Sequence, residues 1–320
     1  MATAKKNKFD KFKQKEPKDY YQILTDNMIK KMEESVEYNT PWLTCNELPY
    51  NPITKTKYSG VNLLYLLMEG YNDPRFYTFN NVKELAKESG LNIYVKSGEH
   101  GTPVFKALQR NIENIDEQSG EDKSFSIWSL AYAGTVFNAK QIEGLPPLVE
   151  LPKIDFQGNE HLDLIESSLI KTGLKVESHE IGRASYIPSK DTVMLPNKEL
   201  FKSENLYMRT KLHEFVHATG SEKRLKRDLS GKFGTMDYAF EELVAELGSY
   251  FLGGHIGIDY SSDNTTHENH AAYLKSWLSS LKDDKKFIWK ASSQAAKAMD
   301  YIVGLTEELK VEKKTNLNFK

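Results

Sequence analysis

The chain has 320 residues, of which 39% are hydrophobic and 28% charged, a composition that excludes wholesale disorder. Its net charge of −2 excludes nucleic-acid binding through bulk positive charge, so such a partner would need a local basic and aromatic surface. The single cysteine, Cys45, excludes an internal disulfide, and no apolar run approaches the roughly 18 residues that span a bilayer, which predicts a cytoplasmic protein with no membrane partner.

The first half of the chain is predicted to be an α+β domain preceded by a flexible basic tail at residues 1–18. Apolar residues at three- and four-residue steps predict a helix from Asp19 to about Tyr38. Two shorter helices are predicted in GVNLLYLLMEG and from Asn80 to Ser89, the latter ending at Gly90. Strand signals in LNIYVKSGEHGTPVFKAL and SFSIWSLAYAGTVFN complete a domain of residues 19–145.

A proline-rich linker at 146–155 leads to a second domain at 156–310 and a tail at 311–320. This domain is predicted to be mainly helical with a small sheet, so that the whole chain is α+β. An opening helix is predicted around 161–170, strands in KVESHEI, ASYIP and DTVML, and further helices at about 197–219, 238–252, 267–281 and 288–309. The strand in DTVML suits either an edge that pairs with an extended substrate or a buried core position.

The segment KLHEFVHATG carries the pattern of a catalytic metal site. His213 and His217 are four residues apart in a helical pattern, so both imidazoles project from one face and can bind one ion. Two imidazoles and one carboxylate suit Zn²⁺ with a fourth position open for water, although Mn²⁺ or another divalent metal is an alternative. Glu214 is placed to take a proton from that water as general base.

The third ligand is expected from YAFEELVAELGSYFL, which offers three glutamates. Glu242 and Glu246 share one helical face, so we predict Glu242 as the ligand and Glu246 as a hydrogen-bond partner that orients a ligand histidine. Glu241 points about 100° away on a helix and is expected to be solvated. The competing interpretation is a chance motif with solvated histidines. His255, Tyr186 and Tyr238 are candidate oxyanion donors, for which a structural role is the simpler interpretation.

Residues 51–110 have the composition of a surface for single strands, with eight Lys or Arg against five Asp or Glu. Aromatic faces stack bases and cations follow the phosphates. Tyrosines and phenylalanines in strands are also common core residues, and lone lysines are usually solvated. The candidate DNA-binding residues are Trp42, Lys57, Tyr58, Asn62, Arg75, Phe79, Lys96 and Lys106.

The order and spacing of several blocks resemble the ArdC antirestriction proteins of plasmids, phages and other mobile genetic elements. The resemblance covers nearly the whole chain and rests on TPWLTCNELPYNPITKTKYSGVNLLYLL, DPRFYTFNNVKELAKESGLNIYVKSGEHGTPVFK, YAGTVFNAKQIEGLP, SYIPSKDTVMLP, KLHEFVHATG and YAFEELVAELGSYFLG. It implies an N-terminal domain that binds single-stranded DNA and a C-terminal zincin-like metallopeptidase domain with a HExxH site. Phe215 and Ala218 depart from the family's usual motif helix, which leaves the metal-binding atoms unchanged.

Three functions remain open at this stage. The leading hypothesis is an antirestriction protein that binds single-stranded DNA and carries a zinc peptidase site, with a protein or peptide of the restriction machinery as a potential substrate. The second is a metallopeptidase whose N-terminal domain recognises a protein substrate. The third is a non-catalytic DNA-binding protein in which the metal only stabilises the fold.

Overall fold

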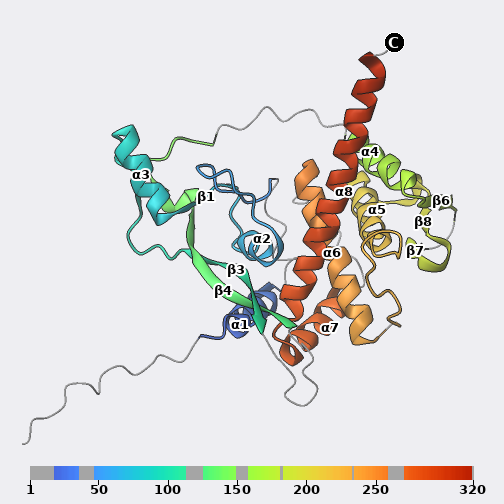
Figure 1. The fold of residues 1–320 in the computed structure, drawn as a ribbon, viewed down its shortest axis with the longest axis horizontal. Coiled ribbons are helices and arrows are strands. Elements are labelled where there is room, and N and C mark those ends of the chain that lie inside the picture. Colours follow the sequence, from blue (N-terminus) through green and yellow to red (C-terminus); the bar gives the residue numbers. More distant parts are fainter. Residues whose placement is uncertain are drawn as a thin grey trace, which may run out of the picture.

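The computed structural model describes residues 18–35, 47–112, 125–148, 158–180, 183–232, 234–258 and 270–318. The chain has the predicted α+β fold class and two domains (Figure 1). Cys45 and Trp42, the basic stretch before Lys18 and most of the predicted linker lie outside the described residues. Within the described ranges, no helix combines the length and apolar character needed to cross a membrane.

In the part of the chain that the structure describes, the first domain has three α-helices, five strands and a 3-10 turn at Ala139–Gln141. Its elements are α1 (Tyr20–Ser35), α2 (Gly60–Leu67), β1 (Phe76–Thr78), α3 (Phe79–Ser89), β2 (Tyr94–Val95), β3 (Thr102–Ile112), β4 (Phe125–Asn138) and β5 (Ile142–Glu143). Helix α3 begins where the Thr78 side chain accepts the Asn81 N–H, and it ends at Gly90, which has φ 69°. The predicted helix from Asn80 to Ser89 is therefore correct except that α3 begins one residue earlier, at Phe79.

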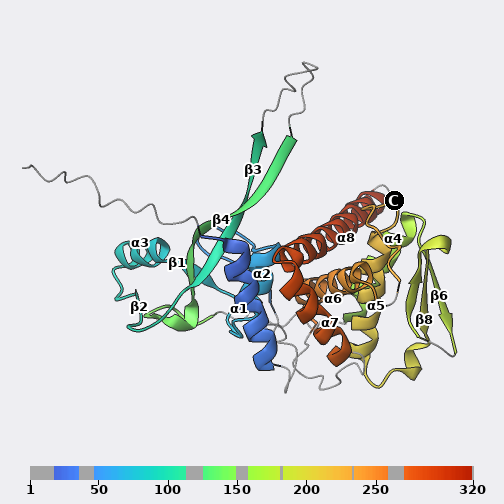
Figure 2. The same ribbon diagram turned by 90° about the horizontal axis from the view of Figure 1, so that it is seen from below.

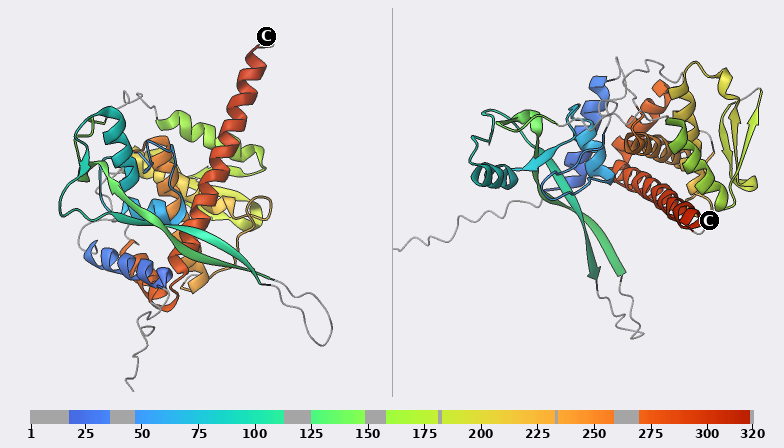
Figure 3. Two further views of the ribbon diagram at one scale, coloured as in Figure 1. Left: turned by 60° about the vertical axis from the view of Figure 1, so that its left-hand side comes forward. Right: turned by 90° about the horizontal axis from the view of Figure 1, so that it is seen from above.

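Two separate antiparallel sheets form from these strands. The runs predicted on either side of the glycine-containing turn do not pair with each other, because β2 pairs with β5 and β3 pairs with β4. Strand β4 lies in the centre of the larger sheet, between β1 and β3. Beyond that sheet, β3 and β4 continue as a two-stranded ribbon that leaves the body of the domain (Figures 2 and 3).

The second domain packs a bundle of helices against a three-stranded sheet. Its elements are α4 (Gly158–Lys171), β6 (Lys175–His179), β7 (Ser185–Ile187), β8 (Thr192–Pro196), α5 (Glu204–Thr219), α6 (Met236–Ile256), α7 (His270–Asp283) and α8 (Phe287–Asn318). The predicted helix at 197–219 is wrong in its first turns. A 3-10 turn at Lys198–Leu200 comes first, and α5 begins only after Ser203, whose side chain accepts the Leu206 N–H.

The strand order β6-β8-β7 places DTVML in the middle of the sheet. Val193 and Leu195 are 0% and 2% exposed, so the buried-core alternative is correct and the edge-strand alternative is wrong. The edge strands of the described sheet are β7 and β6 instead. Strand β7 pairs with β8 antiparallel, and β6 pairs with β8 parallel on the other side.

One hydrophobic core joins the two domains, since α1 and α2 pack against α7 and α8. Tyr21 meets Trp289 edge to face at 5.5 Å, and the Thr25 hydroxyl donates to the Lys285 carbonyl at 2.8 Å. Helix α8 also runs nine residues past its predicted end at Leu309, through most of the segment expected to be a tail (Figure 1). Helix α8 thus packs against the other helices of the second domain and also against the first domain.

Candidate metal centre

Helices α5 and α6 cross closely enough to bring residues of both into one site. The inner face of α5 is fully buried, with Leu212, Phe215 and Val216 all at 0% exposure. On α6, Gly248 lies so near Val216 that a Cβ added to the glycine would be 2.8 Å from Val216 Cγ1. Only glycine permits this approach without displacement. At this crossing, the face of α5 that carries His213 and His217 lies opposite the first turns of α6.

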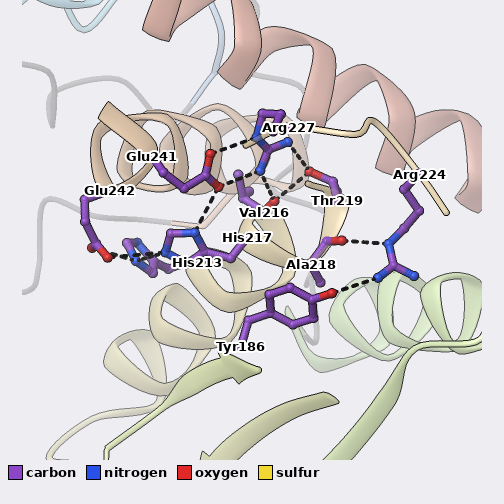
Figure 4. Close-up of polar contacts among 10 residues, drawn as sticks. All are labelled: Tyr186, His213, Val216, His217, Ala218, Thr219, Arg224, Arg227, Glu241 and Glu242. Atoms are coloured by element: carbon purple, nitrogen blue, oxygen red, sulfur yellow. Dashed lines mark hydrogen bonds and ion pairs between the residues drawn. The ribbon is translucent and has the colours of Figure 1, made fainter. Parts of the chain in front are cut away.

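Three potential ligands meet at that crossing (Figure 4). The two Nε2 atoms of His213 and His217 are 3.1 Å apart. Glu242 Oε2 lies 3.5 Å from His213 Nε2, and Glu242 Oε1 lies 3.7 Å from His217 Nε2. Ligand bonds of roughly 2.1 Å in a tetrahedron put neighbouring ligand atoms about 3.4 Å apart. The donor set and its spacing therefore fit one divalent cation without rearrangement.

The electrostatics of the cluster also suit a cation. Burial opposes ionisation of Glu242, but the His213 hydrogen bond and the charges of both imidazoles lower its pKa to about 2. Burial works against protonated His213 too, yet hydrogen bonds to Glu242 and Glu246 raise the pKa of His213 well above its usual value. The site holds a carboxylate that needs a positive partner, and a divalent metal can replace the imidazolium proton in that role.

Glu241 is not solvated, so that expectation is wrong. Its side chain is buried, and Oε1 lies 3.0 Å from His217 Nδ1 (Figure 4). Burial raises the pKa of Glu241, but hydrogen bonds from Arg227 and His217 outweigh it and hold the pKa below its usual value. Glu246, predicted as an orienting partner, has Oε2 3.5 Å from His213 Nδ1, at the outer limit of a hydrogen bond. Each histidine thus has its own carboxylate behind it.

Arg227 completes the cluster from the loop between α5 and α6. It donates to both carboxylate oxygens of Glu241, to the Thr219 hydroxyl at 2.8 Å and to the Val216 carbonyl at 2.7 Å. Its side chain is only 5% exposed. Arg227 therefore ties the C-terminal turn of α5 to the carboxylate that orients His217.

The cluster opens onto a cleft of about 840 Å³. Glu214 lines the cleft beside His213 and His217, and so do residues of β7 and the segment after it. Tyr238 lines it too, and its hydroxyl helps to lower the pKa of Glu242. His255 is not among the lining residues. Of the three candidate oxyanion donors, only the two tyrosines border the cleft.

Tyr186 on β7 is held by a network of hydrogen bonds and ion pairs that does not include the three potential ligands. Its hydroxyl donates to Asp191 Oδ1 at 2.9 Å, and Asp191 in turn pairs with Arg224 and Lys223. Burial and the Asp191 carboxylate raise the pKa of Tyr186 to about 12, so the hydroxyl stays protonated. Arg224 also donates to the Ala218 carbonyl at 2.6 Å. This network fixes the cleft-lining strand β7 to the end of α5 and is the structural role anticipated for Tyr186.

Comparisons with known proteins match both domains. Residues 18–137 match the N-terminal domain of anti-restriction factor ArdC, and residues 163–294 match a zincin-like metallopeptidase family. The metal-free crystal structure of the antirestriction ArdC protein from plasmid R388 superposes with a TM-score of 0.69 and 32% identity, covering 91% of this chain and 99% of that one. The chain belongs to the ArdC family of antirestriction proteins.

Further relatives extend the ArdC match. A second structure of the R388 protein, with Mn(II) bound, gives a TM-score of 0.66 at 30% identity, over 90% of this chain and 98% of that one. The protein y4eC of Sinorhizobium fredii is 31% identical over 89% of this chain and 92% of its own length. DNA primase TraC of Escherichia coli is 31% identical over 93% of this chain, which spans only 28% of that primase.

Three DNA-binding candidates in the ArdC-like first domain are engaged within the protein. Asn62 both donates to and accepts from the Phe105 backbone, at 2.7 and 2.8 Å. Arg75 pairs with Asp73 and donates to the Pro146 carbonyl. Tyr58 is half-buried and packs edge to face on Phe76. These three side chains have a structural role, because their polar groups or rings already contact other parts of the protein.

The other described candidates lie on the surface. Phe79 is 49% exposed, and the Lys83 ammonium sits 4.7 Å from its ring centre. Lys57 and Lys106 are exposed. Lys96 donates to the Lys140 carbonyl at 2.9 Å, with its ammonium half-exposed. Lys57 precedes α2, Lys96 follows β2 and Lys106 lies on β3, so the three lysines come from separate segments of the domain.

The sequence did not predict the roles of four residues. Glu241 and Arg227 orient the metal cluster, and Trp128 and Tyr132 on β4 are 50% and 46% exposed. The period-two pattern of Trp128, Leu130 and Tyr132 was the available signal for an aromatic strand face. No sequence signal identified Arg227, because its contacts depend on how a loop returns across two helices.

Proposed function

We propose that this protein is an antirestriction factor that binds single-stranded DNA through its first domain and hydrolyses peptide bonds at a Zn²⁺ site in its second. The observation that carries the peptidase part is the meeting of His213, His217 and Glu242 beside Glu214 in one cleft. The first domain's match to the N-terminal domain of ArdC supports the DNA part.

In the proposed site, His213, His217 and Glu242 hold the metal, which when bound polarises a water and lowers its pKa towards about 7. Glu241 and Glu246 keep the two imidazoles in the tautomer whose Nε2 faces the ligand cluster. Glu214 is buried against the cleft and accepts the proton of the attacking water before passing it to the leaving amine. Tyr238, at the same rim, is placed to donate to a developing oxyanion.

The position of the edge strand β7 is evidence that the substrate is a peptide. It is paired only with β8 in the described sheet, and Ala184, Ser185 and Tyr186 line the cleft. An extended peptide can add to such an edge through main-chain hydrogen bonds, which recognise a backbone without fixing the sequence. The Tyr186–Asp191–Arg224 network links this edge to the C-terminal end of α5.

Glu214→Gln tests the peptidase part. The variant should retain the bound metal and the fold, measured by metal analysis and circular dichroism, and should lose cleavage of a fluorescent unfolded protein such as labelled casein. Glu222→Gln, an exposed carboxylate outside the cleft, is the matched control. Equal cleavage by Glu214→Gln and wild type contradicts the assignment, and a wild-type protein that binds metal without any cleavage supports the purely structural metal.

Fluorescence anisotropy tests the DNA part. Labelled single strands should bind more tightly than duplexes of the same length, and binding should weaken as salt rises, because phosphate contacts release counterions. Equal affinity for single strands and duplexes contradicts single-strand recognition. If Glu214→Gln protects incoming DNA from restriction as well as wild type does, then protection depends on binding and not on peptide hydrolysis.

A further inference from the structure

Three aromatic side chains on one face of β4 lie in line with Phe79 at the start of α3, and we propose that single-stranded DNA stacks its bases on these four residues. Phe79, Tyr132 and Trp128 are 49%, 46% and 50% exposed, and half-buried Phe137 lies next to Phe79, with ring centres 6.4 Å apart. We call these four residues the aromatic track. The proposal rests on the proposed DNA-binding function and specifies where in the first domain the strand lies.

A β-bulge keeps the track on one face. The register of β4 with β3 shifts so that Ala133 has no partner on β3. Tyr132 and Thr135, three residues apart, consequently point the same way, and their hydroxyl oxygens are 2.7 Å apart. Side chains two residues apart share a face of a strand. Phe137 therefore continues the face beyond Thr135, and Trp128 continues it beyond Tyr132.

Helix α1 packs on the middle of this face, where Leu130, between Trp128 and Tyr132, is only 8% exposed, and it leaves the track aromatics on either side of Leu130 accessible. Tyr20, at the start of α1, stacks on Tyr132 with ring centres 6.3 Å apart and an interplanar angle of 22°. Phe79, at the start of α3, covers one side of Phe137. Phe105, directly opposite Tyr132 on β3 and therefore on the same face, is only 5% exposed and belongs to the core. Phe79, Tyr132 and Trp128 thus each keep about half of their surface open to solvent, as a stacking platform requires.

Charge and length favour a nucleic-acid strand over an apolar partner. The Lys83 ammonium lies 4.7 Å from the Phe79 ring centre, where it can also meet a phosphate. Asp19, the acid preceding Tyr20, is paired with Lys285 at 2.5 Å and adds little repulsion. Phe137 lies nine residue steps after Trp128, or about 30 Å of extended chain. That length suits the roughly 4 to 16 nucleotides that folds for single strands bind.

The test uses the full chain and a fluorescent oligo-dT strand. Phe79→Ala and Trp128→Ala should each weaken binding roughly 5- to 150-fold, the range expected for loss of one stacked base. Trp128→Phe should retain most of the affinity, because it keeps an aromatic face. Tyr94→Ala is the matched control, since Tyr94 is a 47% exposed aromatic on β2 of the same domain and outside the track. Ultraviolet cross-linking followed by peptide mapping should attach the strand to peptides containing Trp128 or Phe79.

The outcomes separate the track from the proposed function. If wild type binds oligo-dT, but the two alanine variants bind as tightly as Tyr94→Ala, the track is wrong and DNA binding stands. Cross-links confined to other peptides also overturn the track. Equal losses for single strand and duplex contradict base stacking. If wild type binds no single strand, both the proposed function and the track fail.

Discussion

Arg227 holds Glu241 through two ion-pair contacts, Nε to Oε2 at 2.9 Å and Nη2 to Oε1 at 2.8 Å. The same Oε1 lies 3.0 Å from His217 Nδ1, so the guanidinium fixes the carboxylate that fixes the imidazole. Because Arg227 also donates to the Val216 carbonyl, it links the C-terminal turn of α5 to the Glu241 carboxylate that orients His217. A loop residue that acts through Glu241 therefore controls the direction of a ligand.

Breaking this pair should weaken metal binding without unfolding the domain. We expect Glu241→Gln and Arg227→Met to lower the affinity for Zn²⁺ or Mn²⁺ by about 10- to 100-fold, the usual effect of losing a partner behind a ligand histidine. Glu242→Ala should lower it further, because it removes a ligand. Competition with a chromophoric chelator measures the affinities, with Glu222→Gln as control. Unchanged affinity in Glu241→Gln would show that His217 needs no orienting carboxylate.

The contrast between Glu242 and Glu241 shows how far the sequence predicts this site. The spacing of His213 and His217 and the shared face of Glu242 and Glu246 are properties of single helices, and periodicity reveals them. Whether Glu241 is solvated depends on what crosses the neighbouring face of α6. Arg227 occupies that face after a turn of chain that carries no periodic signal. Local patterns therefore predicted the ligand candidates and Glu246, but not the support that Glu241 and Arg227 give to His217.

The same limit explains the sheet. The strand in DTVML was recognisable, but its place depends on β6 and β7 pairing on either side of it. Its apolar residues Val193 and Leu195 fit a buried strand, whereas the sequence also allowed an edge. Strand order is a relation between segments, and only the assembled sheet determines which strand can accept a substrate.

The ion pair between Asp191 and Arg224 should make stability depend on pH in the acid range. Burial raises the pKa of Asp191, but hydrogen bonds from Arg224, Tyr186 and Lys223 outweigh it and lower the pKa below its usual 3.8. A carboxylate with a depressed folded-state pKa stabilises the fold above its unfolded pKa, and that stability is lost as the pH falls through the folded pKa.

Asp191→Asn should therefore lower the free energy of unfolding by about 3 kcal/mol near pH 7, because it leaves the buried Arg224 guanidinium without its counter-charge. Asparagine suits the φ of 49° at this position, so the variant isolates the charge from the backbone conformation. Urea titrations at pH 7 and near pH 3 measure the effect. The gap between variant and wild type should narrow at the lower pH, and a gap that stays constant would assign the effect to packing.

Leu24 should report whether the two domains unfold together. It is 0% exposed on α1, in the hydrophobic core that α1 and α2 share with α7 and α8. Leu24→Ala should destabilise the protein by about 2 to 5 kcal/mol, as expected for a cavity in a core. Because the core is common, far-ultraviolet circular dichroism and metal release should shift together on heating. Metal release that keeps its wild-type midpoint would mean that the second domain holds its structure without the first.

The close crossing of α5 and α6 at Gly248 should also contribute to metal affinity. A Cβ at this position would lie 2.8 and 3.0 Å from the two γ-carbons of Val216, which is itself fully buried. Gly248→Ala should therefore push the helices apart and destabilise the fold by about 1 to 3 kcal/mol. It should also weaken metal binding, since Glu242 moves with α6 away from the two histidines.

Gly304→Ala is the matched control for the helix crossing, because Gly304 lies in α8 with no atom within 4 Å of its Cβ position. That substitution should leave metal affinity unchanged and stabilise the helix slightly. Chelator competition and urea titration measure the two effects. Adding Val216→Ala to Gly248→Ala should restore part of the metal affinity if the helix spacing is the cause, whereas additive losses in the double variant would place the cause elsewhere.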